Sequence, residues 1–473
     1  MINRKLFASI ILFGTATTLT GCGITPGGGR GGNDSDVDEY GRTEVTIEVL
    51  KGGLGETVYR ELAKAYNDAH PDVSLSITLN RTINDTVDLS LQQGKNVADA
   101  YCIRDINKIK RFYSQGYIKD LTDVFNSEIE NGETLLDKMD VSAASYSDYN
   151  GKYICIPEYV NANGFVYNKD MFDRYHWEIP TTTEQFQVLL DKILADTGGE
   201  VKPIVFTRDA QGYVYYLLNG INTSYNGIAN MDRIVEFENS EIFNPTNCTG
   251  KKAALTCMQN WMLEENGYVL KGSIGMSNND AIKNLMDGKA AMMLNGSWFE
   301  TEPAAVSSRN KPNLGIMKVP EYSVGGTIKR AEGYTSEEGK GLIHSEYTAN
   351  FIVPEKAKHA DIAIDFLKFI STNAMCELYT KCCNSIRPFN YNKDSTLDTY
   401  KDMSTFGKSV LDMAKNNTLY VPVSHNPRAI AGEISLWPMN DADSYHVNRL
   451  LKQSYTPDQC LQLEYQMAKS ILG

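Results

Sequence analysis

The chain has 473 residues, of which 22% are charged and 42% hydrophobic, and its formal net charge at pH 7 is −13. This length and apolar content are sufficient for two or three domains with hydrophobic cores of their own. Because the acidic excess is spread without long runs, the composition argues against nucleic acid or an anionic membrane surface as a partner.

The first 21 residues have the pattern of an export signal. Arg4 and Lys5 supply a basic start, and residues 6–13 form an apolar stretch that is too short to span a bilayer. The tetrapeptide Leu-Thr-Gly-Cys that ends at Cys22 resembles the lipobox of bacterial lipoproteins, in which the cysteine is lipidated and becomes the first residue of the mature chain. We therefore predict a lipoprotein signal peptide over residues 1–21 and lipidation of Cys22. The alternative is an ordinary cleavage site with an incidental cysteine.

Residues 22–43 are predicted to hold the lipidated cysteine and a flexible linker. After Cys22 the sequence is Gly-rich and then acidic, which is typical of a linker. About 20 such residues span roughly 25 Å on average as a random coil. The folded part would therefore be tethered to the outside of the membrane without crossing it.

The cysteines and histidines show no spacing typical of a metal site or a catalytic centre. The sequence lacks CxxC pairs, HExxH, GxSxG, a phosphate-binding loop and a GxGxxG at a strand-to-helix turn. We therefore expect no resident metal, no cofactor and no catalytic residue. A disulfide stays open, either between Cys248 and Cys257 or with Cys382 or Cys383 as a partner.

The first folded segment is predicted to be a strand, a helix and a strand in succession. Residues 44–49 and 73–79 alternate apolar and polar side chains, which is the period of a half-buried strand. Between them, Val58, Leu62 and Tyr66 recur at four-residue steps, which is typical of a helix. Short connections between these elements predict a βαβ unit, and hence an α/β fold with a partly parallel sheet.

A further strand is predicted over residues 98–103, followed by a helix that begins near residue 105 and ends at Gly116. Ligands in open α/β sheets bind beyond the carboxyl ends of the strands. This rule nominates the residues that follow two predicted strands: Lys51, Gly52 and Gly53, and Arg104 with Asp105. The alternative is that the glycines only form a turn and that the charged pair only caps the helix.

A second candidate for a ligand contact follows a strand near the middle of the chain. A helix is predicted to end at Asp287, and a strand over residues 290–294 leads into Asn295-Gly296-Ser297-Trp298. Trp298 directly after a strand end, on a glycine turn, is well placed to stack on a flat ligand. As a core residue, it would more often lie within the strand.

Three stretches together resemble the extracellular solute-binding proteins of ABC importers, in the large carbohydrate-binding group that includes maltose-binding protein. The most specific is GKYICIPEYVNANGFVYNKDMFDRYHWEIPTTTEQF, residues 151–186. Also similar are DGKAAMMLNGSW, residues 287–298, and KHADIAIDFLKFIST, residues 358–372. The resemblance runs from about Val45 to the C-terminus.

The resemblance implies a two-lobed α/β clamp of the periplasmic-binding-protein type, with an interlobe cleft and a hinge. The chain would cross between the lobes near residues 159–163, 345–350 and 387–391. Each lobe would then consist of two segments: residues 44–160 and 346–388 for lobe 1, and residues 161–345 and 389–473 for lobe 2. At the first crossing, Gly164 would give the backbone freedom to bend and Asn161 would face the ligand.

Carried over by position, the ligand contacts of the family join the residues nominated above. The predicted ligand-binding residues are Lys51, Gly52, Arg104, Asp105, Asn161, Gln211, Tyr213, Trp298 and Trp437. Aromatic rings stack on the C–H faces of sugars, and the polar groups of this set can satisfy their hydroxyls. Trp437 matches the family pattern weakly. The loop over residues 325–344 departs from it and leaves the role of Tyr334 open.

The function implied by the resemblance is that of a lipid-anchored, monomeric binding protein on the outer face of the cytoplasmic membrane. It would capture a sugar or oligosaccharide, close about its hinge, and deliver the ligand to the ABC permease without catalysis. The alternatives are a binding protein for another polar solute, a sensor subunit that uses the same clamp, and an exported glycoside-acting enzyme. Arg104 and Asp105 carry opposite charges and Asn161 adds a neutral amide, a combination that suits a neutral polyol better than a polycation or a phosphate.

Overall fold

The computed structural model describes residues 36–209, 211–306, 308, 310–323, 341–430, 433–434, 447–452 and 454–473. The predicted signal peptide, Cys22, Tyr334 and Trp437 lie outside these residues, as does most of the loop over residues 325–344. Residues Val37–Gly473 form one unit by their contacts, and the fold is that of this unit. Within the described ranges, none of the helices has the length and hydropathy that a membrane span requires.

The first sheet has the strand order β2-β1-β3-β14-β8. Its strands are β1 (Thr43–Leu50), β2 (Val73–Asn80), β3 (Ala100–Ile103), β8 (Ile156–Pro157) and β14 (Asn350–Ile352). β1 pairs in parallel with β2 and β3, whereas β14 pairs antiparallel with β3 and β8. With α1 (Thr57–Ala69) between β1 and β2, the predicted βαβ unit is confirmed. The predicted strand over residues 98–103 begins two residues later than expected, at Ala100.

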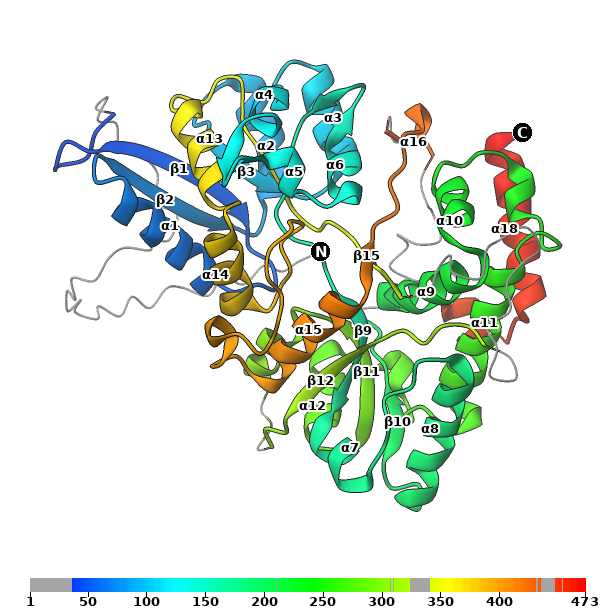
Figure 1. Ribbon diagram of the computed structural model, residues 1–473. Helices are drawn as coiled ribbons and strands as arrows, with labels where there is room; N and C mark the ends of the chain where they lie inside the picture. The colour runs from blue at the N-terminus through cyan, green and yellow to red at the C-terminus, as the bar shows by residue number, and fades with distance from the viewer. Residues whose placement is uncertain are drawn as a thin grey trace, which may run out of the picture. The chain divides into compact units, whose positions relative to one another are not determined.

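Helices α1, α2 (Ile83–Gln93), α6 (Val141–Ser147) and α13 (Ala360–Phe369) contact strands of the first sheet, and Figure 1 shows this part in blue to cyan and yellow. In α1 the buried side chains include Val58, Leu62 and Tyr66, which are the residues whose spacing predicted the helix. The other helices here are α3 (Ile106–Ser114), α4 (Thr122–Phe125), α5 (Leu135–Lys138) and α14 (Asn373–Cys383). Two small hairpins complete this part: β4 (Glu128–Glu130) with β5 (Glu133–Thr134), and β6 (Asp148–Tyr149) with β7 (Lys152–Tyr153).

The second sheet has the strand order β10-β11-β9-β12. Its strands are β9 (Asn163–Asn168), β10 (Lys202–Val205), β11 (Ala290–Gly296) and β12 (Leu314–Lys318). β9 pairs antiparallel with β11 and with β12, and β10 pairs in parallel with β11. The predicted strand over residues 290–294 is therefore too short, because pairing with β9 continues to Gly296, which lies opposite Asn163.

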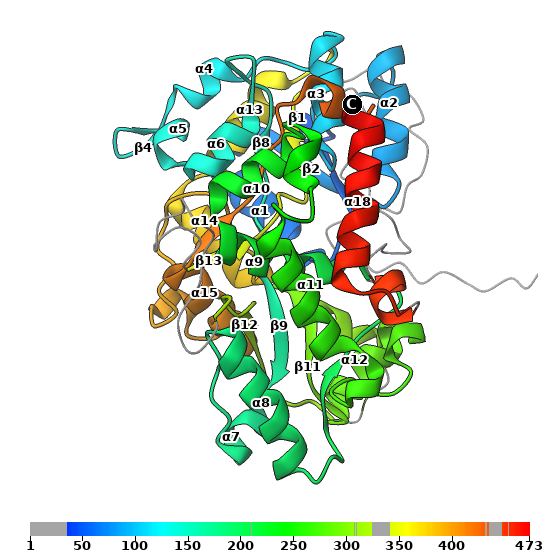
Figure 2. The same cartoon turned by 90° about the vertical axis from the view of Figure 1, so that its right-hand side faces the viewer.

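The helices around the second sheet begin at conventional caps, which explains where several of them start. Thr182 and Gln185 form a capping box at the first turn of α8, and Thr456 with Gln459 does the same for α18. Figure 2 shows α8, α11 and α18 from the side. The bounds are α7 (Lys169–Tyr175), α8 (Thr183–Asp196), α9 (Val214–Asn226), α10 (Ile228–Val235), α11 (Thr249–Met262), α12 (Asn278–Met286), α15 (Thr405–Asn416) and α18 (Pro457–Leu472). The short helix α16 (Pro427–Ile430) contacts α3 of the first part instead.

Three chain segments run side by side between the two sheets. The chain leaves the first sheet after Pro157 and enters the second at Asn163, and it returns between β13 (Leu342–His344) and β14. Val160 forms backbone bridges with Tyr347, in the second predicted crossing, and with Ile386, one residue before the third. β13 also pairs in parallel with β15 (Thr418–Tyr420).

Gly164 does not have the role that the sequence suggested. It lies inside β9 and pairs with Asn295 on one side and Lys318 on the other. A Cβ atom at this position would lie 2.0 Å from the carbonyl oxygen of Met317. The glycine is therefore needed for the close approach of β12, and the bend between the sheets lies before Asn163.

Candidate functional site

A cavity of about 780 Å³ is lined by residues from the parts of the chain that carry both sheets. Five of the nine predicted ligand-binding residues line it: Arg104, Asp105, Asn161, Tyr213 and Trp298. Two other cavities, of about 800 and 530 Å³, have none of the nominated residues among their described linings. The first cavity is therefore the candidate site.

The other four predicted ligand-binding residues are not among the described residues that line this cavity. Lys51 forms an ion pair with Glu56, and the next residue, Gly52, has open space around it. The cavity is reached one position later, by Gly53. The side chain of Gln211 and the whole of Trp437 lie outside the described residues.

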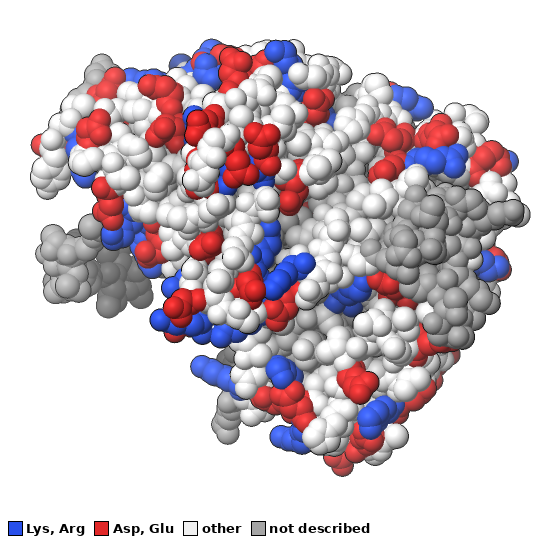
Figure 3. Space-filling view, in the orientation of Figure 1, with Lys and Arg blue, Asp and Glu red and all other residues white. Residues whose placement is uncertain are grey.

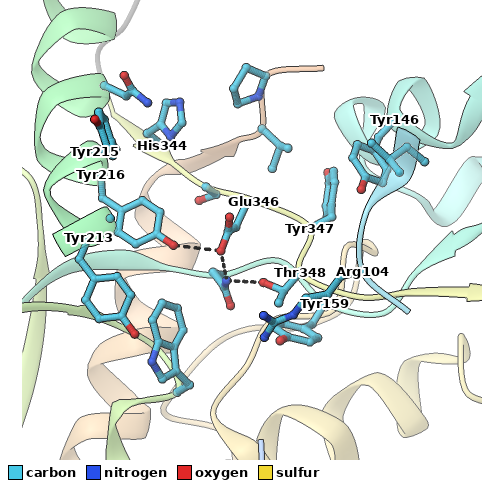
Figure 4. A pocket seen from close by; sticks show the side chains of 18 of the residues that line it. Arg104, Tyr146, Tyr159, Tyr213, Tyr215, Tyr216, His344, Glu346, Tyr347 and Thr348 are labelled. Carbon is cyan, nitrogen blue, oxygen red and sulfur yellow. Dashed lines mark hydrogen bonds between the residues drawn. The ribbon is translucent and has the colours of Figure 1, made fainter. Parts of the chain in front are cut away.

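Trp298 and Tyr213 form an aromatic wall on one side of the cavity. Trp298 lies two residues after the end of β11, and Tyr213 ends the short 3-10 helix η1 (Gln211–Tyr213) before α9. Their ring centroids lie 5.6 Å apart, and Tyr216 continues the wall with its ring nearly parallel to that of Tyr213 at 5.8 Å. Figure 4 shows Tyr213 and Tyr216 along this side of the cavity. Such a wall can hold the apolar face of a flat ligand.

Asp105 caps a helix and lines the cavity at the same time. Its Oδ1 accepts hydrogen bonds from the backbone N–H groups of Asn107 and Lys108, at 3.0 and 3.2 Å, which makes Asp105 the N-cap of α3. Helix capping, the alternative role considered from the sequence, therefore applies to one oxygen of Asp105. Arg104, beside it, has an exposed side chain that lies near Tyr159 in Figure 4.

Glu346 is the centre of a hydrogen-bond network that the sequence did not reveal. Its Oε1 accepts hydrogen bonds from the hydroxyl of Tyr216 at 2.9 Å and from Nδ2 of Asn161 at 3.3 Å. The same Asn161 nitrogen donates to Oγ1 of Thr348 at 2.6 Å. Asn161 is 2% exposed, so its side chain is held in place by its partners. The available signal was the pairing of two predicted crossings, which places residue 346 beside residue 161.

Burial sets the proton state of the groups around the cavity. It raises the pKa of Tyr213 and of Tyr159, and burial together with the charge of Glu346 raises that of Tyr216 well above its usual range. These hydroxyls therefore keep their protons and can donate. Burial lowers the pKa of His344 to about 4, so its ring is neutral near pH 7.

Glu302 is a second carboxyl group in the cavity lining. Burial raises its pKa, although the hydrogen bond from Nδ2 of Asn295 at 3.1 Å opposes this shift. Its oxygen is thus already used by a neighbouring side chain. Among the described residues, no group of three or more His, Cys, Asp or Glu side chains could hold a metal ion. The eight described cysteines are free thiols, including all four considered for a disulfide.

The sequence pattern of the bacterial extracellular solute-binding proteins matches residues 52–375, which is more than half of the chain. The chain belongs to this family. A curated relative, the multiple sugar-binding protein of Streptococcus mutans, is 23% identical over 355 residues, which are 73% of this chain and 76% of the relative. The predicted family resemblance is confirmed.

Several solved structures share the fold of this chain. MalE from Xanthomonas citri has a TM-score of 0.66 at 12% identity and covers 91% of this chain and 97% of its own. RafE from Streptococcus pneumoniae has a TM-score of 0.66 at 16% identity, with 91% and 98% covered. The GacH receptor of Streptomyces glaucescens has a TM-score of 0.62 at 18% identity, with the same coverage. This family member thus has the predicted two-lobed α/β fold.

Proposed function

We propose that this solute-binding protein captures a carbohydrate in the cavity of about 780 Å³ and delivers it to the permease of an ABC importer. The observation that carries the proposal is the aromatic wall of Trp298 and Tyr213 beside a set of fixed hydrogen-bonding groups. Sugars present C–H patches on their faces and hydroxyls at their edges, and this cavity offers a complement to both.

The ligand-binding residues in this proposal are those of the nominated set that line the cavity: Arg104, Asp105, Asn161, Tyr213 and Trp298. Arg104 offers several donors in a planar fork, and the free oxygen of Asp105 offers an acceptor. Lys51 and Gly52 precede Gly53 in the sequence but do not line the cavity themselves, so they are less well placed to contact the ligand. Gln211 and Trp437 stay predictions from the sequence.

The names of the relatives support a saccharide as the ligand. The curated relative is named for multiple sugars, and the GacH receptor was solved in complex with acarbose. The charge on the surface is compatible with a neutral ligand, since Lys and Arg are interspersed with Asp and Glu on the face in Figure 3. We infer that no covalent chemistry takes place, because binding and release alone meet the needs of import.

The lobe boundaries of the proposal are residues 44–160 with 346–388, and residues 161–345 with 389–473. They are supported by the strands of each sheet, because β14 returns to the first sheet while α15 packs against β12 of the second. The first residues before β1 depart from a simple linker, since Val37 forms a backbone bridge with Thr43. Closure would bend the chain at the three crossings.

A lipid anchor on Cys22 would keep the protein on the outer face of the cytoplasmic membrane, and we propose it as a monomer there. The support is the lipobox-like tetrapeptide in the sequence, together with membership in an extracellular family. Cys22→Ser should release the full-length protein from the membrane fraction of the expressing cells. Continued membrane retention of this variant would remove the anchor from the proposal.

The experiment that tests the binding function is a thermal-shift screen of the mature protein. The panel is D-galactose, maltotriose, xylotriose, raffinose and triacetylchitotriose, with spermidine and glucose 6-phosphate for the alternative solutes. A ligand at 100 times its dissociation constant adds about 2.7 kcal/mol to the free energy of unfolding, which gives a clear rise in Tm. The carbohydrate assignment would be overturned if only spermidine or glucose 6-phosphate raised the Tm, or if none of the compounds did.

A further inference from the structure

Glu346 lies on the segment that returns from the second sheet to the first, and its position is fixed by the neighbouring crossing. The backbone N–H of Asn161 donates to the carbonyl oxygen of Glu346 at 3.2 Å, and Val160 forms a bridge with Tyr347. The two crossings therefore hold residues 161 and 346 side by side. Figure 4 shows the carboxylate of Glu346 in the cavity, facing the hydroxyl of Tyr216.

Only one oxygen of this carboxylate is used by the described residues. Oε1 accepts hydrogen bonds from Tyr216 and Asn161, whereas no described residue donates to Oε2. The side chain is exposed and lines the cavity, so a ligand can reach it. Two other carboxylates line the cavity: Oδ1 of Asp105 accepts from backbone N–H groups of α3, and Oε2 of Glu302 accepts from Nδ2 of Asn295.

Both donors to Oε1 are themselves held in place. Asn161 is buried and also donates to Thr348, and Tyr216 lies on α9, a helix of 13 residues that packs against α11. Because burial and the charge of Glu346 raise the pKa of Tyr216, its hydroxyl stays protonated and acts as a donor. The direction of the carboxylate is thus determined before a ligand arrives, which lowers the entropy cost of binding.

We propose that Glu346 determines the specificity of the site: its Oε2 accepts a hydrogen bond from a ligand hydroxyl, with Tyr216 and Asn161 as positioning residues. The proposal rests on the carbohydrate-binding function and narrows it to neutral saccharides. A uronic acid or another anionic saccharide would bring a like charge near Glu346, and such contacts weaken binding.

Glu346→Gln tests this proposal with little change in shape. The amide keeps an oxygen that accepts from Tyr216, but it replaces the acceptor that faces the cavity by an NH₂ donor. The test ligand is the saccharide with the largest thermal shift in the panel. Calorimetry should show that Glu346→Gln binds it at least about tenfold more weakly than the wild type, as expected for loss of a hydrogen bond to a charged group. Glu355→Gln, at an exposed carboxylate nine residues further along, is the matched control and should bind like the wild type.

The same variant should also change the discrimination between charges. The wild type should bind a neutral saccharide of the panel more tightly than its counterpart with a uronic acid unit. The ratio of these two affinities should be at least severalfold smaller in Glu346→Gln. Glu346→Asp, which keeps the charge but shortens the side chain, should keep the preference for the neutral sugar. An unchanged ratio in Glu346→Gln would overturn the proposal.

The positioning role of Tyr216 is tested by a double-mutant cycle with Glu346→Ala. Tyr216→Phe removes only the hydroxyl that donates to Glu346, so it should weaken binding in the wild-type background and have little further effect in Glu346→Ala. Additive effects would show that Tyr216 acts independently of Glu346. Equal affinities of wild type and Glu346→Gln would refute the role of Glu346 while the carbohydrate function stands. If no saccharide binds the wild type, the proposed function itself fails.

Discussion

His344 lines the cavity with both ring nitrogens buried and without a hydrogen-bond partner among the described residues. Its ring lies edge-on to that of Tyr420, with 6.1 Å between the centroids. Burial in these surroundings lowers the pKa of His344 to about 4, compared with about 6.5 for an unperturbed histidine. Between these two values the unfolded chain binds a proton that the folded chain does not.

The stability that His344 contributes should therefore depend on pH. It is fully present above pH 6.5 and is lost as the pH falls from 6.5 towards 4, by up to about 3 kcal/mol at 1.36 kcal/mol per pKa unit. Chemical denaturation of the wild type and His344→Gln at pH 7.5, 6 and 5 measures this effect. The free energy of unfolding should fall more steeply with acid in the wild type. Parallel pH profiles would contradict the burial of a neutral ring.

Single residues also show how far the sequence could predict the site. Arg104, Asp105 and Trp298 could be nominated because each follows a strand, and the edge of a sheet is visible in the periodicity of the chain. Glu346 was not nominated, because it meets Asn161 only through the pairing of two crossings that are distant in the sequence. Its neighbours in the sequence do not signal that contact.

At the level of elements, the close approach of β9 and β12 depends on Gly164. A Cβ atom there would lie 2.0 Å from the carbonyl oxygen of Met317, a backbone atom that cannot rotate away. Gly164→Ala should therefore lower the free energy of unfolding by about 3 kcal/mol, at the upper end of what overpacking costs. Urea denaturation measures the change.

Gly275→Ala is the control for this prediction, since a Cβ atom at Gly275 would meet no other atom within 4 Å. Its free energy of unfolding should stay within about 0.5 kcal/mol of the wild type. Equal stabilities of the two variants would show that the strands can separate without cost, and the assigned role of Gly164 would be wrong.

The elements that local patterns determine were predicted well. The alternation in β1 and β2 and the four-residue spacing in α1 are properties of the segments themselves. The extent of β9 and β11 was not predicted, because Asn163 and Gly296 join their strands only through pairing with each other. Neither residue has a preference for strands, so their assignment depends on tertiary contacts.

For the whole molecule, the two sheets and the three crossings provide the parts of a hinge. If a saccharide bridges the aromatic wall and Glu346, closure should make the mature protein more compact. Small-angle scattering should therefore give a smaller radius of gyration with the best-binding saccharide of the panel than without it. Superimposable profiles at saturating ligand would count against a clamp that closes.

The central claim is that the aromatic wall binds a saccharide in this cavity, and calorimetric titration of Trp298→Ala beside the wild type tests it most directly. The wild type should bind the best saccharide of the panel with one site per chain. Trp298→Ala should fold, as judged by its melting curve, yet bind at least about thirtyfold more weakly, as expected when a buried aromatic anchor worth about 2 kcal/mol is truncated. Trp298→Phe, which keeps a planar ring, should retain part of the affinity. Equal affinities of Trp298→Ala and the wild type would contradict the claim.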